Sequence, residues 1–222
     1  MILLLGDIHA DYYILKHAIE KARMKDITCI IQLGDFGLFD EHNGHHFHKI
    51  CRESHVPIYF IDGNHDDCSR WTALKEVTRV WYDANLFYAP RGTVMDLDNR
   101  TIAFMGGAGS IDKDIRIRYN QHWDENENIR SIDVERLIKN TLGKKIDLFL
   151  THCPPNSVVE EHFDPYGKLM FGVGLDWHDN NQDIIEDLWD QLDYPPIYSG
   201  HMHKTVIGDS YRILDINELV EV

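Results

Sequence analysis

The sequence predicts an α/β fold, and two patterns carry that prediction. Short apolar runs at residues 2–5, 27–33 and 56–61 have the length of buried strands, and each is followed closely by a glycine and polar side chains. Segments with helical periodicity lie between these runs, at residues 11–24 and 40–54. This alternation of strand and helix is typical of an α/β sheet whose loops gather at one edge. The 222-residue chain is 43% hydrophobic and 11% aromatic, which is enough to fill a sizeable core.

The first helix begins at an N-cap that the sequence indicates. Asp11 or a neighbour can accept a hydrogen bond from the free amides of the first turn, and the helix then extends to about Met24. The apolar residues of this segment recur at helical spacing and share one face: Ile14, Leu15, Ala18, Ile19 and Ala22.

The second half of the chain has a different pattern. Tyr88 and residues 93–97 and 101–105 form short strands separated by turn sequences, which predicts hairpin or meander pairing in place of crossover helices. A polar excursion rich in charge, glycine and asparagine follows at residues 106–131. Beyond it we expect helices at residues 133–140 and 180–192, and strands at residues 146–151, 197–199, 206–207 and 211–216. No repeat or linker interrupts the chain, so a single domain over residues 1–222 is expected.

The charge balance and the cysteines narrow the class of protein. With 22 basic and 37 acidic residues the formal net charge is −15, which disfavours duplex nucleic acid as a partner because phosphate backbones are repelled. No apolar run reaches the ~18–20 residues that span a bilayer. No basic leader accompanies the first apolar run, so we expect a cytoplasmic protein with no membrane partner. The four cysteines form no C-x-x-C pair, which indicates reduced, packed thiols.

The strongest functional signal is a set of polar residues that follow five apolar strands. The carboxyl ends of strands in an α/β sheet are where sites assemble, and a glycine before the polar residue allows the backbone to turn sharply. Two aspartates, one asparagine and several histidines offer mixed oxygen and nitrogen ligands, which favour Mn, Fe, Zn or Co over Ca or Mg. In chain order the five blocks are Asp7-x-His9, Gly34-Asp35, Gly63-Asn64-His65-Asp66, His152 and Gly200-His201-x-His203.

These five blocks, in this order, resemble the signature of the calcineurin-like metallophosphoesterases, and the resemblance to small bacterial and phage members covers nearly the whole chain. It implies a four-layer α-β-β-α sandwich of two facing mixed sheets with a dinuclear metal site at the carboxyl ends of the strands. The implied cofactor is a pair of divalent ions, with Mn favoured and Fe, Zn, Co or Ni as alternatives. The resemblance implies that one ion is bound by Asp7, His9 and His203. It implies that the other ion is bound by Asn64, His152 and His201, and that Asp35 bridges the two ions.

The same resemblance implies hydrolysis of a phosphoester by in-line attack of a hydroxide that bridges the two ions. His65, which follows the ligand Asn64, would protonate the leaving oxygen as a general acid. The expected substrate is a phosphodiester or a small phosphomonoester, with nucleotides among the candidates; the oligomeric state is not predicted. Two alternatives stay open: a nuclease of the same fold, and a metal-binding interaction scaffold without activity.

The second block departs from the pattern of the protein phosphatase branch of this family. That branch has GD-x-x-DRG, whereas here Asp35 is followed by Phe36 and Gly37 and neither the arginine nor the second aspartate is in place. The usual acidic partner of the catalytic histidine is therefore missing, and Asp66 or Asp40 is the candidate substitute. This departure argues against a phosphoprotein phosphatase, and the resemblance of the third block and of the excursion to the family favours a phosphodiesterase.

The excursion supplies the candidate substrate-binding residues. Its sequence GGAGSIDK at residues 106–113 is similar to a segment that precedes an arginine-bearing loop and a tryptophan in many small bacterial and phage members. The corresponding side chains are Arg116, Arg118 and Trp123. An arginine could donate to a phosphate oxygen and an aromatic ring could stack on a base, with a solvated loop as the alternative.

Three further features have a structural interpretation. Arg70 and Trp71 are interpreted as helix packing, and Cys153 as a packed thiol beside His152. A histidine cluster falls on the predicted helix at residues 40–54, where a solvated face is favoured over an adventitious metal site. Its members are His42, His45, His46 and His48.

Overall fold

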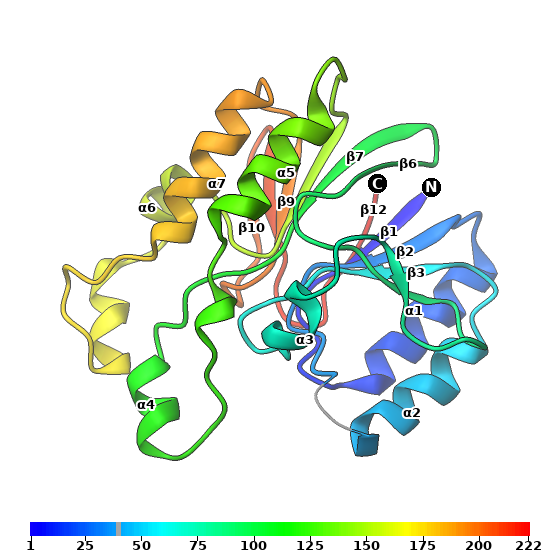
Figure 1. The fold of residues 1–222 in the computed structure, drawn as a ribbon, viewed down its shortest axis with the longest axis horizontal. Helices are drawn as coiled ribbons and strands as arrows, with labels where there is room; N and C mark the ends of the chain where they lie inside the picture. The colour runs from blue at the N-terminus through cyan, green and yellow to red at the C-terminus, as the bar shows by residue number, and fades with distance from the viewer. Residues whose placement is uncertain (39–40) are drawn as a thin grey trace.

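The computed structural model describes residues 1–38 and 41–222, which form two mixed sheets (Figure 1). In the first sheet β1, β2, β3 and β5 run parallel, and an antiparallel strand closes each edge. Its order is β12 (Leu219–Glu221), β1 (Ile2–Leu5), β2 (Cys29–Gln32), β3 (Ile58–Phe60), β5 (Leu86–Tyr88) and β4 (Thr78–Arg79).

The second sheet repeats this plan. Strands β7, β8, β9 and β11 are parallel, and β6 and β10 are antiparallel edge strands. Its order is β10 (Val206–Ile207), β11 (Tyr211–Ile213), β9 (Ile197–Ser199), β8 (Leu148–Thr151), β7 (Arg100–Met105) and β6 (Val94–Leu97).

Helices cover the outer face of each sheet, and shorter helices follow the strand ends (Figure 1). In the described part of the chain, no helix is long and apolar enough to cross a membrane. The helices are α1 (Tyr12–Met24), α2 (Glu41–Arg52), α3 (Cys68–Thr72), α4 (Lys113–Arg118), α5 (Ser131–Thr141), α6 (Asn156–His162) and α7 (Asn180–Gln191), with two 3-10 helices, η1 (Glu125–Glu127) and η2 (Pro165–Phe171).

The alternation of side chains along β1 shows why the molecule has four layers. Successive residues of a strand point to opposite faces, so an all-apolar strand must be covered on both sides. Leu3 and Leu5 pack in the cluster formed with the outer helices. Ile2 and Leu4 pack in a second cluster, which contains residues of both sheets, such as Phe104. The predicted α-β-β-α sandwich of two facing mixed sheets is therefore confirmed.

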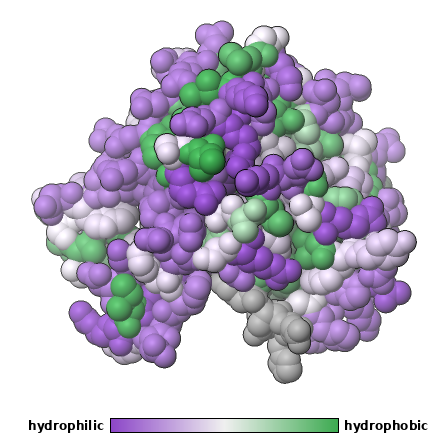
Figure 2. Space-filling view, in the orientation of Figure 1, coloured by the Kyte–Doolittle hydropathy of each residue, from purple (hydrophilic) through white to green (hydrophobic). Residues whose placement is uncertain are grey.

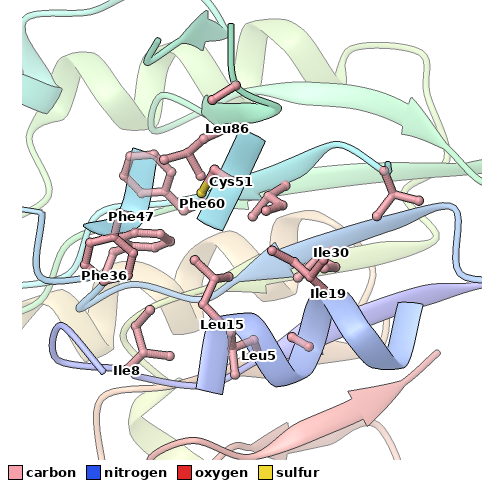
Figure 3. Close-up of a cluster of buried hydrophobic side chains, with 14 of the residues drawn as sticks. Leu5, Ile8, Leu15, Ile19, Ile30, Phe36, Phe47, Cys51, Phe60 and Leu86 are labelled. Carbon is pink, nitrogen blue, oxygen red and sulfur yellow. The ribbon is translucent and has the colours of Figure 1, made fainter. Parts of the chain in front are cut away.

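The layer between the first sheet and its helices shows this packing in detail (Figure 3). Leu15 and Ile19 of α1 face the sheet, as the predicted helical spacing requires, and Phe47 of α2 packs in the same cluster. Asp11 caps α1 by accepting from the backbone N–H of Tyr13. The prediction of this helix and of its cap is confirmed.

The long apolar strands were predicted within a few residues, and the pairing was wrong at one point. Residues 93–97 and 101–105 do form a hairpin, closed by Asp98 and Asn99 with φ of 52° and 61°. The strand that contains Tyr88 does not join them: it pairs parallel with β3 in the first sheet. A strand of three residues has no local signal that identifies its partner, and here the partner is chosen by burial between Phe60 and Trp71.

A buried ion pair joins the first sheet to the excursion. Arg91 is 1% exposed and donates to Asp62 Oδ2 from Nε at 3.0 Å and from Nη2 at 2.6 Å. The other carboxylate oxygen of Asp62 accepts from the Tyr88 hydroxyl at 2.9 Å. Arg91 also donates to the backbone carbonyls of Asn126 and Asn128, so one guanidinium fixes the excursion against the end of β3.

We predict that Arg91→Leu lowers the free energy of unfolding by about 3–5 kcal/mol, because it leaves the Asp62 carboxylate buried without its partner. Urea denaturation followed by circular dichroism measures this change. Arg52→Leu is the matched control, since Arg52 pairs with Asp83 at 3.1 Å on the surface and its loss should change stability little. Equal effects of the two substitutions would contradict the prediction.

Candidate metal centre

The carboxyl ends of strands from both sheets bring the predicted ligands together. Asp7 follows β1, Asp35 follows β2, and His152 follows β8, and all three side chains are fully buried. Four side chains offer ligand atoms that all lie within 4.8 Å of one another, namely Asp7, His9, Asp35 and His203. The two sheets meet directly here, because the backbone N–H of His201 donates to both carboxylate oxygens of Asp7 at 3.1 Å.

One half of the site is built around Asp7. His203 Nε2 lies 3.1 Å from Asp7 Oδ2, and this hydrogen bond raises the pKa of His203. His9 Nε2 lies 2.9 Å from His203 Nε2 and 3.8 Å from Asp35 Oδ2. Nitrogen and oxygen ligand atoms therefore face a common space on this side of Asp35.

The other half contains two acceptors that face each other. His152 Nδ1 lies 2.8 Å from the carbonyl of Leu33, which fixes the ring proton on Nδ1 and leaves a lone pair on Nε2. That Nε2 lies 3.1 Å from Asn64 Oδ1 and 3.5 Å from Asp35 Oδ1. The ring of His201 is next to it, with centroids 5.0 Å apart. Burial lowers the pKa of His152 and of His201 to about 3, so both rings are neutral at physiological pH.

This donor set fits a cation. Opposed acceptor atoms repel each other unless a positive charge lies between them. Asp35 Oδ2 is buried and has no hydrogen-bond partner in the part of the chain that the structure describes, which leaves out residues 39–40 and the side chains of residues 41–43. Burial, together with the nearby Asp7, raises the pKa of Asp35 well above its ordinary value. Divalent ions that accept both nitrogen and oxygen ligands would satisfy these atoms.

The backbone of the site is held in an uncommon conformation. Four of the predicted ligands have positive φ: His9 (42°), Asp35 (54°), His201 (70°) and His203 (49°). Residues other than glycine rarely adopt this region, and such residues concentrate at functional sites. The sequence carries no direct signal for this strain.

Two glycines before the ligand blocks are required for space. A Cβ at Gly63 would lie 2.1 Å from Asp35 Oδ1, and a Cβ at Gly200 would lie 2.1 Å from Asp7 Oδ1. Neither residue has a positive φ, so the expected sharp turn is not the reason for glycine here. The glycines instead let the carboxylates approach the neighbouring backbone closely.

His65 lies at the open side of the site. Its backbone N–H donates to Asp35 Oδ1 at 2.8 Å, and its ring meets the ring of His9 with centroids 5.5 Å apart. His9, His65 and His203 keep between 31% and 42% of their side-chain surface exposed, so a substrate can reach them. The surface is hollowed at the lower edge of Figure 2, beside the part that carries α4. Burial, and next the Arg116 guanidinium, lower the pKa of His65 to about 4.

The structure describes one of the two candidate acidic partners of His65, namely Asp66, and shows its carboxylate hydrogen-bonded to the backbone. Asp66 is buried and accepts from three backbone N–H groups, those of Phe36 (3.2 Å), Gly37 (2.8 Å) and Gly63 (2.9 Å). Its carboxylate therefore ties the loop after β2 to the loop after β3, and burial raises its pKa to about 7. Asp40 lies outside the described residues. A carboxylate oxygen of Asp112 lies 4.0 Å from His65 Nε2. The sequence did not single out Asp112 for this position, although the residue stands in the GGAGSIDK segment.

The candidate substrate-binding residues are not gathered at one place. Arg116 is 4% exposed and points into the protein, where it donates to Ser110 Oγ at 2.8 Å and pairs with Glu127 at 3.0 Å. Arg118 is exposed on α4. Trp123 is half-buried, with Lys113 Nζ 3.8 Å from its ring centre. Glu127 had no sequence signal, because it lies eleven positions beyond Arg116 in the chain.

The side chains given a structural interpretation behave in that way. Trp71 is buried in α3, with Arg70 over its ring. Burial and the neighbouring Asp179 raise the pKa of Cys153 well above its ordinary value, so this thiol stays protonated. On α2, His46 stacks on Tyr12 and His48 pairs with Asp83, while the side chain of His42 is outside the described part.

Comparisons with known proteins agree with this architecture. The family model described as calcineurin-like phosphoesterase matches residues 1–205. A solved crystal structure aligns with 96% of this chain and 89% of its own, with a TM-score of 0.57 and 10% sequence identity. At that identity the similarity shows the fold alone. No curated protein matches the sequence.

The four-layer sandwich and its converging acceptor atoms define a metal-binding α/β protein. The chain belongs to the calcineurin-like phosphoesterase family, whose model covers all five predicted blocks. Membership implies metal-dependent hydrolysis of phosphoric esters. The family normally binds divalent metals, and the Asp/His cluster provides a site for them.

We predict that Mn²⁺ stabilises the wild-type chain and that Asp35→Asn removes this response. A ligand at a hundred times its Kd adds about 2.7 kcal/mol to the free energy of unfolding. Without metal, the Asp35→Asn substitution should raise the melting temperature, because it removes a carboxylate buried beside Asp7. Thermal melts with and without Mn²⁺, and after EDTA, measure both effects.

The control for this prediction is Asp96→Asn, which removes an exposed carboxylate on β6. It should change neither the metal-free melting temperature nor the response to Mn²⁺. Full stabilisation of the Asp35→Asn chain by Mn²⁺ would show that Asp35 is not part of the metal site.

Proposed function

We propose that this chain hydrolyses phosphodiesters or small phosphomonoesters with two divalent metal ions, and that nucleotides are among its substrates. The observation that carries this proposal is the convergence of acceptor atoms from both sheets around Asp35, with His65 at the open side. Mn²⁺ is favoured for the mixed nitrogen and oxygen ligands, with Fe, Zn, Co or Ni as alternatives.

Seven side chains would hold the two ions. We assign Asp7, His9 and His203 to one ion, Asn64, His152 and His201 to the other, and Asp35 to both. The position of Asp35 supports this division, because Oδ2 lies 3.8 Å from His9 Nε2 whereas Oδ1 lies 3.5 Å from His152 Nε2. When bound, such a pair neutralises the phosphoryl oxygens and lowers the pKa of water, which supplies the nucleophile.

His65 is proposed as the general acid. Its backbone is fixed by Asp35, and its ring is partly exposed at the mouth of the site. The pKa of His65 is low in the free protein, and an anionic phosphoester beside the ring would favour its protonated form. The proton would pass from the ring to the leaving oxygen. Asp66 would act indirectly, by holding the two loops that carry Asp35 and His65 in register.

Several features support a diester or small-molecule substrate over a phosphoprotein. Leu38 stands where the protein phosphatase branch has its second aspartate, and it is packed in the core beneath α2 together with Phe36, so this loop places an apolar side chain at a position that is charged in that branch. Arg118 and Trp123 remain the proposed contacts to the substrate beyond its phosphate.

We assign residues 1–222 to one catalytic domain, because β12 pairs with β1 and the site takes residues from both sheets. Four buried free cysteines support a cytoplasmic location.

The test measures hydrolysis of aryl and alkyl phosphoesters by the wild-type chain and by His65→Ala. With Mn²⁺ the chain should hydrolyse bis(p-nitrophenyl) phosphate faster than p-nitrophenyl phosphate, and EDTA should abolish both activities. Loss of His65 should lower kcat by about 10²–10⁴-fold on an alkyl ester, because an alkoxide must be protonated as it leaves. The effect on the aryl ester should be much smaller, since nitrophenolate leaves without a proton.

The control variant is His45→Ala, which removes an exposed histidine of α2. It should leave both activities unchanged. Equal losses on the alkyl and aryl esters would remove His65 from the role of general acid. Two bound Mn²⁺ ions with no hydrolysis of any ester would favour the interaction scaffold, and cleavage of DNA would favour the nuclease.

A further inference from the structure

The side chain of Asn64 has two chemically different ends, and the protein fixes which end faces the metal site. Nδ2 donates to Ser110 Oγ at 3.0 Å. Oδ1 points the other way and lies 3.1 Å from His152 Nε2. A rotation of the amide by 180° would exchange the oxygen for an N–H group, which repels a cation.

The hydroxyl of Ser110 can hold Asn64 in only one of these two orientations. A serine hydroxyl donates one hydrogen bond and accepts two. Ser110 donates its proton to Glu127 and accepts from Arg116 Nη1 at 2.8 Å. The remaining position can only accept, so it pairs with the Nδ2 end of Asn64 and excludes the Oδ1 end.

Glu127 and Arg116 are in turn held by each other. Glu127 is 1% exposed and Arg116 4%, and Arg116 Nη2 lies 3.0 Å from Glu127 Oε1. Arg116 Nε also donates to the carbonyl of His122 at 2.8 Å. A buried network whose members are all paired is rigid, because any rearrangement leaves a buried polar group without a partner.

We propose that Ser110, oriented by Glu127 and Arg116, is a positioning residue that fixes the amide of Asn64 with its oxygen toward the metal. The proposal rests on the metal ligands assigned under the proposed function. By this proposal, residues of the excursion at 106–131 hold the metal ligand Asn64 in place. Arg116 helps to orient Ser110 and does not contact the substrate. The residues that hold metal ligands in place are as necessary as the ligands, since their loss weakens metal binding about 10- to 100-fold.

The experiment titrates the full chain with Mn²⁺ in the absence of substrate, by calorimetry and by electron paramagnetic resonance. Wild type should bind two ions and give the spin-coupled signal of a Mn²⁺ pair. In Ser110→Ala one ion should bind with unchanged affinity and the other about 10- to 100-fold more weakly, so the coupled signal is lost at limiting Mn²⁺. Ser110→Thr keeps the hydroxyl, so this variant should bind two Mn²⁺ ions and give the spin-coupled signal like wild type.

Ser157→Ala is the matched control, because Ser157 Oγ also donates to a glutamate carboxylate, that of Glu186, at 2.7 Å, but on the exposed surface of α6. It should bind both ions like wild type. Circular dichroism of each variant confirms that the chain is folded before titration.

The same serine substitution made in an Asn64→Asp variant separates the effect of amide orientation on Mn²⁺ binding from the effect of packing. Asn64→Asp has oxygen at both ends of the side chain, so its orientation no longer matters. Adding Ser110→Ala to Asn64→Asp should then weaken Mn²⁺ binding no more than the Ser157→Ala control does. An equal loss in both backgrounds would overturn the positioning role, because Ser110 would then act through packing.

The outcomes distinguish this inference from the proposed function. Two tightly bound ions in both wild type and Ser110→Ala would overturn the positioning role and leave the metal site intact. A wild-type chain that binds no divalent ion would overturn the proposed function, and the role of Ser110 with it.

Discussion

Mutual repulsion among buried acceptor groups is the constraint that organises this molecule. Asp7 and Asp35 are carboxylates without exposure, and His152 Nε2 and Asn64 Oδ1 point their lone pairs at each other across 3.1 Å. None of these atoms can satisfy the others, so the arrangement is costly without a cation. The rest of the fold supplies the free energy that holds it, through three apolar clusters that fill both outer layers and the space between the sheets.

The site is stiff because backbone groups, more than side chains, hold the carboxylates. Asp7 accepts from the amide of His201 in the other sheet, and Asp35 accepts from the amide of His65 in the next loop. Asp66 does the same between the loops after β2 and β3. Amide donors cannot be withdrawn without moving a strand end, so the strained φ values of His201 and Asp35 persist.

The strands and the ligand blocks could be predicted because their signals are local. An apolar run of four residues such as Ile2–Leu5 predicts a buried strand, and the glycine and aspartate that follow it predict where the strand ends. The arrangement of two facing sheets came from resemblance to a family, since spacing alone does not say which strands pair. Leu219–Glu221 carries too short a signal to be separated from a loop, yet it closes the first sheet on β1. The burial of Arg116 also escaped prediction, because an arginine in a polar run gives no sign of a carboxylate eleven residues away.

The charge of the whole protein bears on which phosphoester it can admit. A net charge of −15 repels every anion at long range, and a monoester dianion more than a diester monoanion. Under the proposed function, this balance would be reversed near the site, where Asp7 and Asp35 would face two divalent ions. Arg116 adds no charge at the surface, because Glu127 neutralises it inside the protein. Under the proposed function, substrate binding would depend on short-range attraction by the metals, and the proposed diester substrate would have the smaller long-range repulsion to overcome.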